Sequence, residues 1–148
     1  IGGTKNGALM GEALVICNDA LKVDYRYIMK QRGGMLAKGW LLGLQFETLF
    51  TGDLYFSLAK NANAMAARLA QGFAGAGFGF FMPPVSNQIF PLLPLSLIKE
   101  LGETFELQLW GAPQGDSQAT RFVCSWATSP QYVEALVAAV ALWASKAG

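Results

Sequence analysis

Apolar side chains recur at helical spacing through the middle of this 148-residue chain. In residues 54–73 the repeat places Leu54, Leu58 and Leu69 on one face of a helix. A similar stripe predicts a helix over residues 35–50. The pair Gly52-Asp53 between these stretches predicts a kink or a break in the helical path.

Shorter apolar runs predict strands over residues 13–16, 87–93, 105–110 and 120–126, and the last of these shows a two-residue alternation. The first of these runs is apolar throughout and indicates a buried strand. Further helices are predicted over residues 19–30, 94–101 and from residue 130 onward, where Ser129 can cap a helix that begins with Pro130. Glycine, proline and polar residues predict loops over residues 1–11, 72–84 and 111–118.

The order of these elements predicts an α+β fold. Its long helices would be joined to a small, mainly antiparallel sheet flanked by helices. Apolar residues make up 53% of the chain and charged residues 14%, against about 25% charged residues in typical soluble domains. Such a domain is expected to present apolar surface to a partner domain or subunit; the alternative is a compact monomer with a large apolar core. Because Ile1 is not a methionine, the chain is expected to be part of a longer polypeptide.

The charge pattern and the absence of one residue type exclude several functions. The net charge is +1 with no basic stripe, which argues against nucleic-acid binding. The chain contains no histidine, so it cannot form a histidine triad or a histidine metal site, and no metal is expected. Charged residues at Lys38, Glu47 and Asp53 interrupt the most hydrophobic stretch, so no membrane span is predicted. Cys17 and Cys124 lie in apolar stretches and are expected to be two buried thiols in a reducing cytoplasm.

One lysine lies within a glycine-rich loop, in the run Gly2-Gly3-Thr4-Lys5-Asn6-Gly7. The glycine spacing and the residue after the lysine differ from those of a phosphate-binding P-loop. A lysine in such a loop is usually a solvated surface residue. A neutral lysine amine can, however, attack a carbonyl, and glycines let the backbone approach a bound ligand closely.

This run, followed by an apolar strand, resembles the cofactor-lysine segment of the low-specificity threonine aldolases. These are pyridoxal-phosphate enzymes of the aspartate-aminotransferase-like class, or fold type I. Two later segments also resemble the family, in the same order and at similar spacing. They are Lys30-Gln31-Arg32-Gly33-Gly34 with Lys38, and Thr120-Arg121-Phe122-Val123 followed by Ser129-Pro130.

The resemblance implies a role for five residues. Lys5 would hold pyridoxal 5'-phosphate as a Schiff base, and Thr4 would either bind the cofactor phosphate or satisfy the loop backbone. Lys30 would lie near the phosphate, including that of a neighbouring subunit, with Lys38 sharing this duty; a solvated helix end explains Lys30 equally well. Arg121 would bind the substrate carboxylate through two parallel hydrogen bonds. The alternative for Arg121 is an exposed arginine on an edge strand.

The same resemblance implies an activity and an organisation. The activity is cleavage of L-threonine or related β-hydroxy amino acids to glycine and an aldehyde, in a cytoplasmic homodimer or homotetramer. Residues 1–34 would end the large cofactor-binding domain, residues 35–75 would form connecting helices, and residues 76–148 the small C-terminal domain. The missing N-terminal domain would complete the site, so this chain is expected to be inactive alone. Two alternatives remain open: another pyridoxal-phosphate lyase, such as a β-eliminating lyase or phenylserine aldolase, and a non-catalytic apolar interaction domain.

Overall fold

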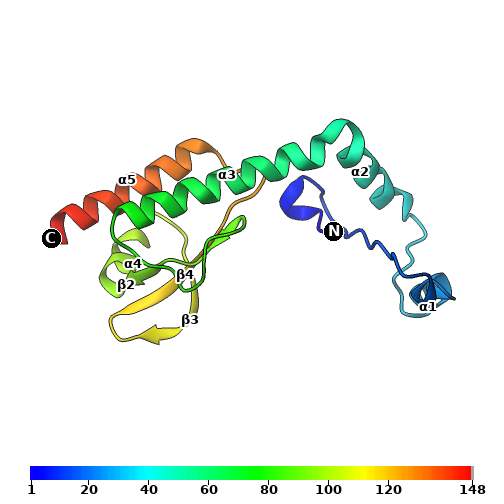
Figure 1. Ribbon diagram of the computed structural model, residues 1–148, viewed down its shortest axis with the longest axis horizontal. Coiled ribbons are helices and arrows are strands. Elements are labelled where there is room, and N and C mark those ends of the chain that lie inside the picture. The colour runs from blue at the N-terminus through cyan, green and yellow to red at the C-terminus, as the bar shows by residue number, and fades with distance from the viewer. Residues whose placement is uncertain (148) are drawn as a thin grey trace. The chain divides into compact units, whose positions relative to one another are not determined.

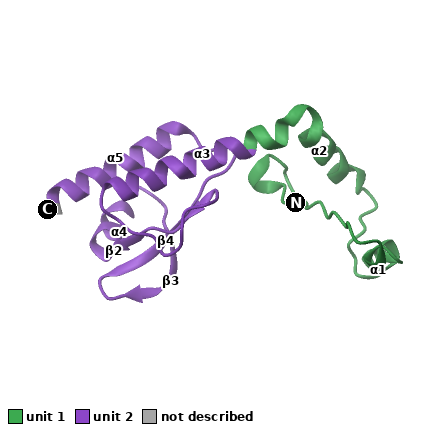
Figure 2. Cartoon of the chain, viewed as in Figure 1, with its two compact units in different colours: residues 1–58 green, residues 59–148 purple. Residues whose placement is uncertain are grey.

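The computed structural model describes residues 1–147, which combine helices with one small antiparallel sheet (Figure 1). This arrangement confirms the predicted α+β class. The chain divides into two compact units, Ile1–Leu58 and Ala59–Gly148, shown in different colours in Figure 2. The three predicted domain ranges stay a prediction.

Unit 1 consists of an opening loop and short helices. Its elements are the 3₁₀ turns η1 (Thr4–Asn6), η2 (Asp19–Leu21) and η3 (Thr51–Asp53), the helices α1 (Tyr25–Gln31) and α2 (Trp40–Phe50), and the first residues of α3 (Leu54–Gly75). The predicted break at Gly52-Asp53 is confirmed, because both residues have positive φ, at 60° and 59°. These left-handed residues lie between α2 and α3 and interrupt the right-handed helical path there.

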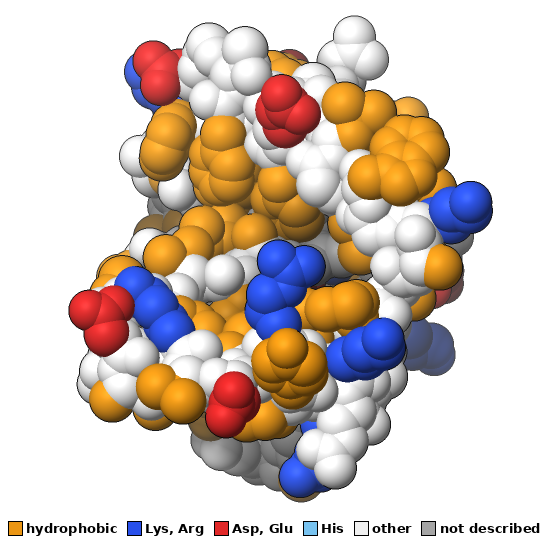
Figure 3. Space-filling view, turned by 90° about the vertical axis from the view of Figure 1, so that its right-hand side faces the viewer, with side chains coloured by type: hydrophobic (Ala, Val, Ile, Leu, Met, Phe, Trp, Pro, Cys, Tyr) orange, Lys and Arg blue, Asp and Glu red, His pale blue; other side chains and the backbone are white. Residues whose placement is uncertain are grey.

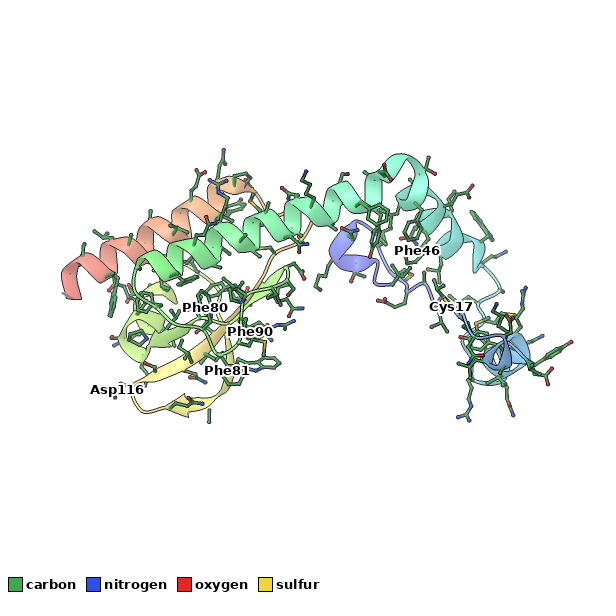
Figure 4. All side chains as sticks on the ribbon, in the orientation of Figure 1. Cys17, Phe46, Phe80, Phe81, Phe90 and Asp116 are labelled. Carbon is green, nitrogen blue, oxygen red and sulfur yellow. The ribbon has the colours of Figure 1, made fainter. Side chains whose placement is uncertain are left out.

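The predicted buried strand over residues 13–16 is wrong. These residues form no strand in unit 1, and the side chains of Leu14 and Val15 are 68% and 64% exposed. A strand that is apolar on both sides is stable only between neighbouring strands and covering helices, and the part of the chain that the structure describes places none around it. Cys17, at the end of this segment (Figure 4), is exposed rather than buried as predicted.

Two helices of unit 1 are shorter than the periodicity predicts. The predicted helix over residues 19–30 is divided into η2 and α1. Asp24, with φ of 54°, precedes α1 and is incompatible with a continuous right-handed helix. The helix predicted from residue 35 begins only at Trp40, and residues 37–39 before it form a turn.

Unit 2 is a four-stranded antiparallel sheet with helices packed against it (Figure 1). The strands are β1 (Gln88–Ile89), β2 (Leu92–Pro94), β3 (Gln108–Gln114) and β4 (Ser117–Val123), and the helices are the rest of α3, α4 (Leu95–Leu101) and α5 (Pro130–Ala147). β4 is the central strand and pairs with the other three, with Ile89 opposite Phe122, Leu92 opposite Ala119, and Leu109 opposite Thr120.

The strand boundaries differ from the predicted ones: β3 begins at Gln108 rather than at residue 105, and β4 ends at Val123 rather than at residue 126. The predicted strand over residues 87–93 is two short strands, because Phe90 and Pro91 separate β1 from β2. The predicted loop over residues 111–118 belongs mostly to β3 and β4. Only Gly115 and Asp116 form the turn, and Gly115 adopts the positive φ of 61° that the turn requires.

The core of unit 2 lies between the sheet and the helices. Its fully buried side chains include Phe73 from α3, Leu93 from β2, Leu97 from α4 and Val140 from α5. Cys124 is buried in this core, as predicted. Within residues 1–147, no helix combines the length and hydrophobicity needed to cross a lipid bilayer.

Candidate functional site

Lys5 lies in the 3₁₀ turn η1, inside a loop that is closed at its base. The backbone carbonyl of Gly3 accepts hydrogen bonds from the N–H groups of Asn6 and Ala8, at 2.9 and 3.0 Å. At the base, the N–H of Ala13 donates to the carbonyl of Ile1 at 2.9 Å. The loop therefore has a defined backbone, and the side chain of Lys5 extends from it into solvent.

Side-chain hydrogen bonds to two helices hold this loop in place. Asn6 is buried, and its Nδ2 donates to the carbonyl of Tyr55 in α3 at 2.7 Å. The hydroxyl of Tyr55 donates in turn to the carbonyl of Gly2 at 3.0 Å. From α2, the Oε1 of Gln45 accepts from the N–H of Leu9 at 2.8 Å. Lys5 is thus an exposed amine on a loop that three anchoring hydrogen bonds hold in place.

The glycines of the loop are required by close approach and by conformation. A Cβ on the buried Gly3 would lie 2.8 Å from the Cβ of Ala8 and 3.1 Å from Cζ of Phe46, which is labelled on α2 in Figure 4. Gly7 has φ of 100°, which side-chain-bearing residues rarely adopt. The Gly-rich run seen in the sequence therefore has a structural reason at these two positions.

The other three predicted cofactor residues are exposed in unit 1. Thr4 adjoins Lys5 in η1, Lys30 lies in the last turn of α1, and Lys38 lies in the turn before α2. The structure brings Thr4 and Lys5 together. Among the described residues, the ion pairs involve Lys22, Arg68 and Lys146, and none joins Lys30 or Lys38 to the Lys5 loop. The face drawn in Figure 3 shows basic and acidic side chains among hydrophobic and uncharged ones.

In unit 2, Arg121 is held in place by two glutamines. Its Nε and Nη2 donate to Oε1 of Gln88 on β1, at 2.9 and 2.8 Å, and its Nη1 donates to Oε1 of Gln108 on β3 at 2.9 Å. The guanidinium carbon lies 5.8 Å from the ring centroid of Trp110, within range of a cation–π contact. Arg121 is half-buried on the central strand, so the alternative of an exposed arginine on an edge strand is wrong.

The guanidinium of Arg121 keeps donors and charge for a ligand. A guanidinium has five N–H groups, and only three are used by the glutamines. Within residues 1–147 no carboxylate lies within 4.0 Å of it. Arg121 also lines an open pocket of about 550 Å³ together with Glu106, Leu107, Gln108, Phe122 and Val123. The arrangement can bind a small carboxylate.

Gln88, Gln108 and Tyr55 were not recognised from the sequence. Gln108 lies directly opposite Arg121 in the β3–β4 ladder, and Gln88 lies opposite Val123 in the β1–β4 ladder. Glutamines are common surface residues, and only the strand register shows that these two flank the arginine. Tyr55 is likewise an ordinary aromatic position at the start of α3.

Comparison with known proteins agrees with the resemblance seen in the sequence. No protein-family model matches the chain. Two curated proteins match the chain. The low-specificity L-threonine aldolase of Pseudomonas aeruginosa is 32% identical over 91% of this chain. The low-specificity L-threonine aldolase of Pseudomonas sp. is 30% identical over 93% of this chain. A solved structure of the threonine aldolase from Leishmania major superposes with a TM-score of 0.84 and 38% identity over 87% of this chain.

These likenesses define a class of protein: the chain is homologous to a family of lyases. Within that class its relatives are the low-specificity L-threonine aldolases, which confirms the predicted resemblance. The chain spans 38% and 39% of the length of the two curated relatives, and 38% of the solved chain.

Proposed function

We propose that this chain acts in the pyridoxal-phosphate-dependent cleavage of L-threonine or related β-hydroxy amino acids to glycine and an aldehyde. It would do so as part of a longer threonine aldolase polypeptide. The observation that carries the proposal is the placement of Lys5, an exposed amine on a loop that Asn6, Tyr55 and Gln45 anchor to two helices. The homology to threonine aldolases supplies the reaction.

The residues of the loop suit an aldehyde cofactor. The side chain of Lys5 is exposed, and the turn that carries it is held by its own backbone and by Asn6 rather than by the lysine. In its neutral form the amine of Lys5 would join the cofactor aldehyde. When bound, pyridoxal phosphate supplies a ring that accepts the electrons of the breaking Cα–Cβ bond. The exposed hydroxyl of Thr4 would bind the phosphate, with Lys30 and Lys38 as further cationic partners.

Arg121 would bind and orient the carboxylate of the substrate. Its two remaining N–H groups and its uncompensated positive charge match a carboxylate. Its fixed geometry limits rotation of the bound amino acid, so that one bond at Cα is presented for cleavage. The open pocket of about 550 Å³ beside Arg121 is of the size that holds a small ligand.

The apolar surface of unit 1 supports the second part of the proposal, a need for further polypeptide. Residues Leu14, Val15, Cys17, Leu21 and Tyr25 border an open pocket of about 550 Å³ whose lining is mainly apolar. Contiguous exposed apolar surface often marks a contact with another protein surface. We propose that the part of a threonine aldolase that this chain does not match covers it, and that the chain is inactive without that part.

The proposal also includes a homodimer or homotetramer and a cytoplasmic location. Both cysteines are free thiols in the described residues, and thiols stay reduced in the cytoplasm. Size-exclusion chromatography with light scattering measures the oligomer directly. The presence of a disulfide in protein isolated from cells would contradict the location.

The test of the activity combines the chain with the unmatched part of the Pseudomonas aeruginosa relative, by co-expression. The expected result is release of glycine and acetaldehyde from L-threonine. Borohydride reduction followed by peptide mass spectrometry should place the pyridoxyl group on Lys5. Lys5→Ala should abolish both signals, while Lys60→Ala, at an exposed lysine of α3, should leave both unchanged.

Three outcomes would contradict parts of the proposal. Activity retained by Lys5→Ala would overturn the assignment of Lys5. Full activity from the 148-residue chain alone would overturn the need for further polypeptide. Products of β-elimination, rather than glycine and aldehyde, would favour another lyase of the same fold.

A further inference from the structure

We propose that Gln88 and Gln108 are positioning residues, which hold the guanidinium of Arg121 in place without neutralising its charge. The charge then remains available for a substrate carboxylate. This inference rests on the proposed role of Arg121 and adds two residues to the site. A glutamate at either position would instead compensate that charge.

The geometry accounts for the positioning. Gln88 on β1 and Gln108 on β3 come from different strands paired with β4, which carries Arg121. Together they accept from Nε and from both Nη nitrogens at 2.8 to 2.9 Å. An arginine side chain loses rotamer entropy when it is fixed. Because the glutamines bind it before any ligand arrives, that cost does not weaken ligand binding.

The chemistry of the two acceptors explains why Arg121 keeps its positive charge. Both glutamines offer neutral amide oxygens, which satisfy N–H groups but do not cancel the positive charge. Elsewhere in the same unit, Arg68 pairs with the carboxylate of Glu134 at 2.6 Å. The carboxylate of Glu106 lines the pocket beside Arg121 but is not within ion-pairing distance of it. The immediate neighbours of Arg121 are therefore uncharged acceptors on both sides.

Replacing either glutamine by glutamate keeps the shape of the side chain and changes only its charge. In Gln88→Glu, a carboxylate oxygen would occupy the place of Oε1, about 2.8 Å from the guanidinium nitrogens. A charge-assisted hydrogen bond of this kind is roughly twice as strong as a neutral one. It would compete with a ligand carboxylate for the same cation. Arg121 would stay fixed, while its affinity for anions would fall.

The test uses the 148-residue chain and sodium propanoate as the probe. Propanoate binding is followed by NMR through the ¹⁵Nε–H resonance of Arg121, with sodium chloride at equal ionic strength as the reference. For Gln88→Glu and for Gln108→Glu we expect the Kd for propanoate to rise about tenfold, corresponding to ~1.4 kcal/mol. The matched control is Gln131→Glu, which adds the same charge at an exposed position of α5 and should leave the Kd unchanged.

A second readout separates positioning from folding. In the Gln→Glu variants the ¹⁵Nε–H resonance of Arg121 should stay sharp and protected, because the guanidinium remains held. In Gln88→Met, a neutral side chain of similar length without an amide acceptor, the resonance should broaden and propanoate binding should weaken. The urea unfolding midpoint of each variant shows whether the fold is intact. If Gln88→Glu does not fold, Gln108→Glu carries the same test.

The outcomes distinguish this inference from the proposed function. Unchanged propanoate binding in Arg121→Gln, or no saturable shift with the unaltered chain, overturns the role of Arg121 itself. Weakened binding in Arg121→Gln together with unaltered binding in both folded Gln→Glu variants overturns only the inference about the glutamines. Weakened binding in both Gln→Glu variants, with the Arg121 resonance retained, supports it.

Discussion

Replacing Gly3 by alanine should disrupt the loop that carries Lys5. The added Cβ would lie 2.8 Å from the Cβ of Ala8, 3.0 Å from the backbone oxygen of Gly11 and 3.1 Å from Cζ of Phe46. Carbon atoms that are not bonded prefer separations of about 3.5–4.0 Å. Two of the three neighbours belong to the backbone or are attached directly to it, so they cannot rotate away. Overpacking of this kind costs about 1–3 kcal/mol of unfolding free energy.

The neighbouring glycine provides a matched control. A Cβ on Gly2 has only Oε2 of Glu12 nearby, at 3.4 Å, and this atom is the end of a flexible, exposed side chain. Gly2→Ala should therefore change the unfolding free energy by no more than about 0.5 kcal/mol. The two variants make the same chemical change at adjacent positions, so a difference between them reports the local packing.

Amide hydrogen exchange measures how far Gly3→Ala opens the loop that carries Lys5. The N–H groups of Asn6 and Ala8 donate to the carbonyl of Gly3, so their protection reports whether the loop is closed. In Gly3→Ala we expect these two amides to exchange about ten- to a hundredfold faster, which corresponds to a local loss of ~1.4–2.7 kcal/mol. Equal protection in Gly3→Ala and Gly2→Ala would refute the reasoning. It would mean that close packing against Ala8 and Phe46 is not why glycine is needed.

Two further predictions concern unit 2 and the cysteines. In Gly72→Ala the new Cβ would lie 2.5 Å from Cγ2 of Val137 on α5. We therefore expect the unfolding free energy, measured by urea denaturation, to fall by about 1–3 kcal/mol. Alanine has the better helix propensity, but that gain is smaller than the cost of the overlap. The double variant Gly72→Ala with Val137→Ala should recover part of this loss. The control Gly75→Ala, where the new Cβ meets nothing within 4 Å, should lose no unfolding free energy. Equal losses at both glycines would contradict the α3–α5 contact. Burial raises the pKa of the Cys124 thiol, and a hydrogen bond with Thr128 lowers it by a smaller amount. At pH 8 the exposed Cys17 should therefore react with a disulfide reagent well before Cys124. Because the Cys124 thiol ionises at lower pH in the unfolded chain than in the folded one, raising the pH past its ordinary pKa of 9.0 should lower the unfolding free energy. Cys124→Ala should remove this pH-dependent contribution. Equal reaction rates of the two thiols would contradict the burial of Cys124.

The long helices were predictable because their signals are local. The repeat of apolar residues in α3 depends only on neighbouring turns of one helix. The start of α5 was predictable for the same reason: Oγ of Ser129 accepts from the N–H of Gln131, and Pro130 occupies the first helical position. Neither feature requires knowledge of what the helix packs against.

The strand boundaries were not predictable from local composition. Gly111 and Pro113 favour a loop, yet both lie in β3. Within residues 1–147 β3 pairs only with β4, and an edge strand tolerates a proline whose missing N–H would face solvent. The register shifts between Trp110 and Gln114, and Gly111 adopts φ of 66° there, as expected of a β-bulge. A bulge and an edge are properties of the assembled sheet.

The candidate site was predictable only where one residue carries its own motif. Lys5 lies in a recognisable glycine-rich run, and Arg121 lies in a strand with a family resemblance. The acceptors around Arg121 are glutamines separated from it by 33 and 13 positions. Their role depends on which residues face each other across β4, and the sequence pattern alone does not determine that register.

The two units differ in how far each completes its own site. Unit 2 has a closed core around Leu93 and Leu97, and Arg121 already has its acceptors, so its carboxylate site should be formed in the chain alone. Unit 1 leaves the apolar residues Leu14 and Val15 exposed, so we expect the surroundings of Lys5 to depend on the polypeptide that packs there. Carboxylate binding and cofactor attachment should therefore separate experimentally. The chain alone should bind propanoate through Arg121, while stable attachment of the cofactor to Lys5 should require the further polypeptide.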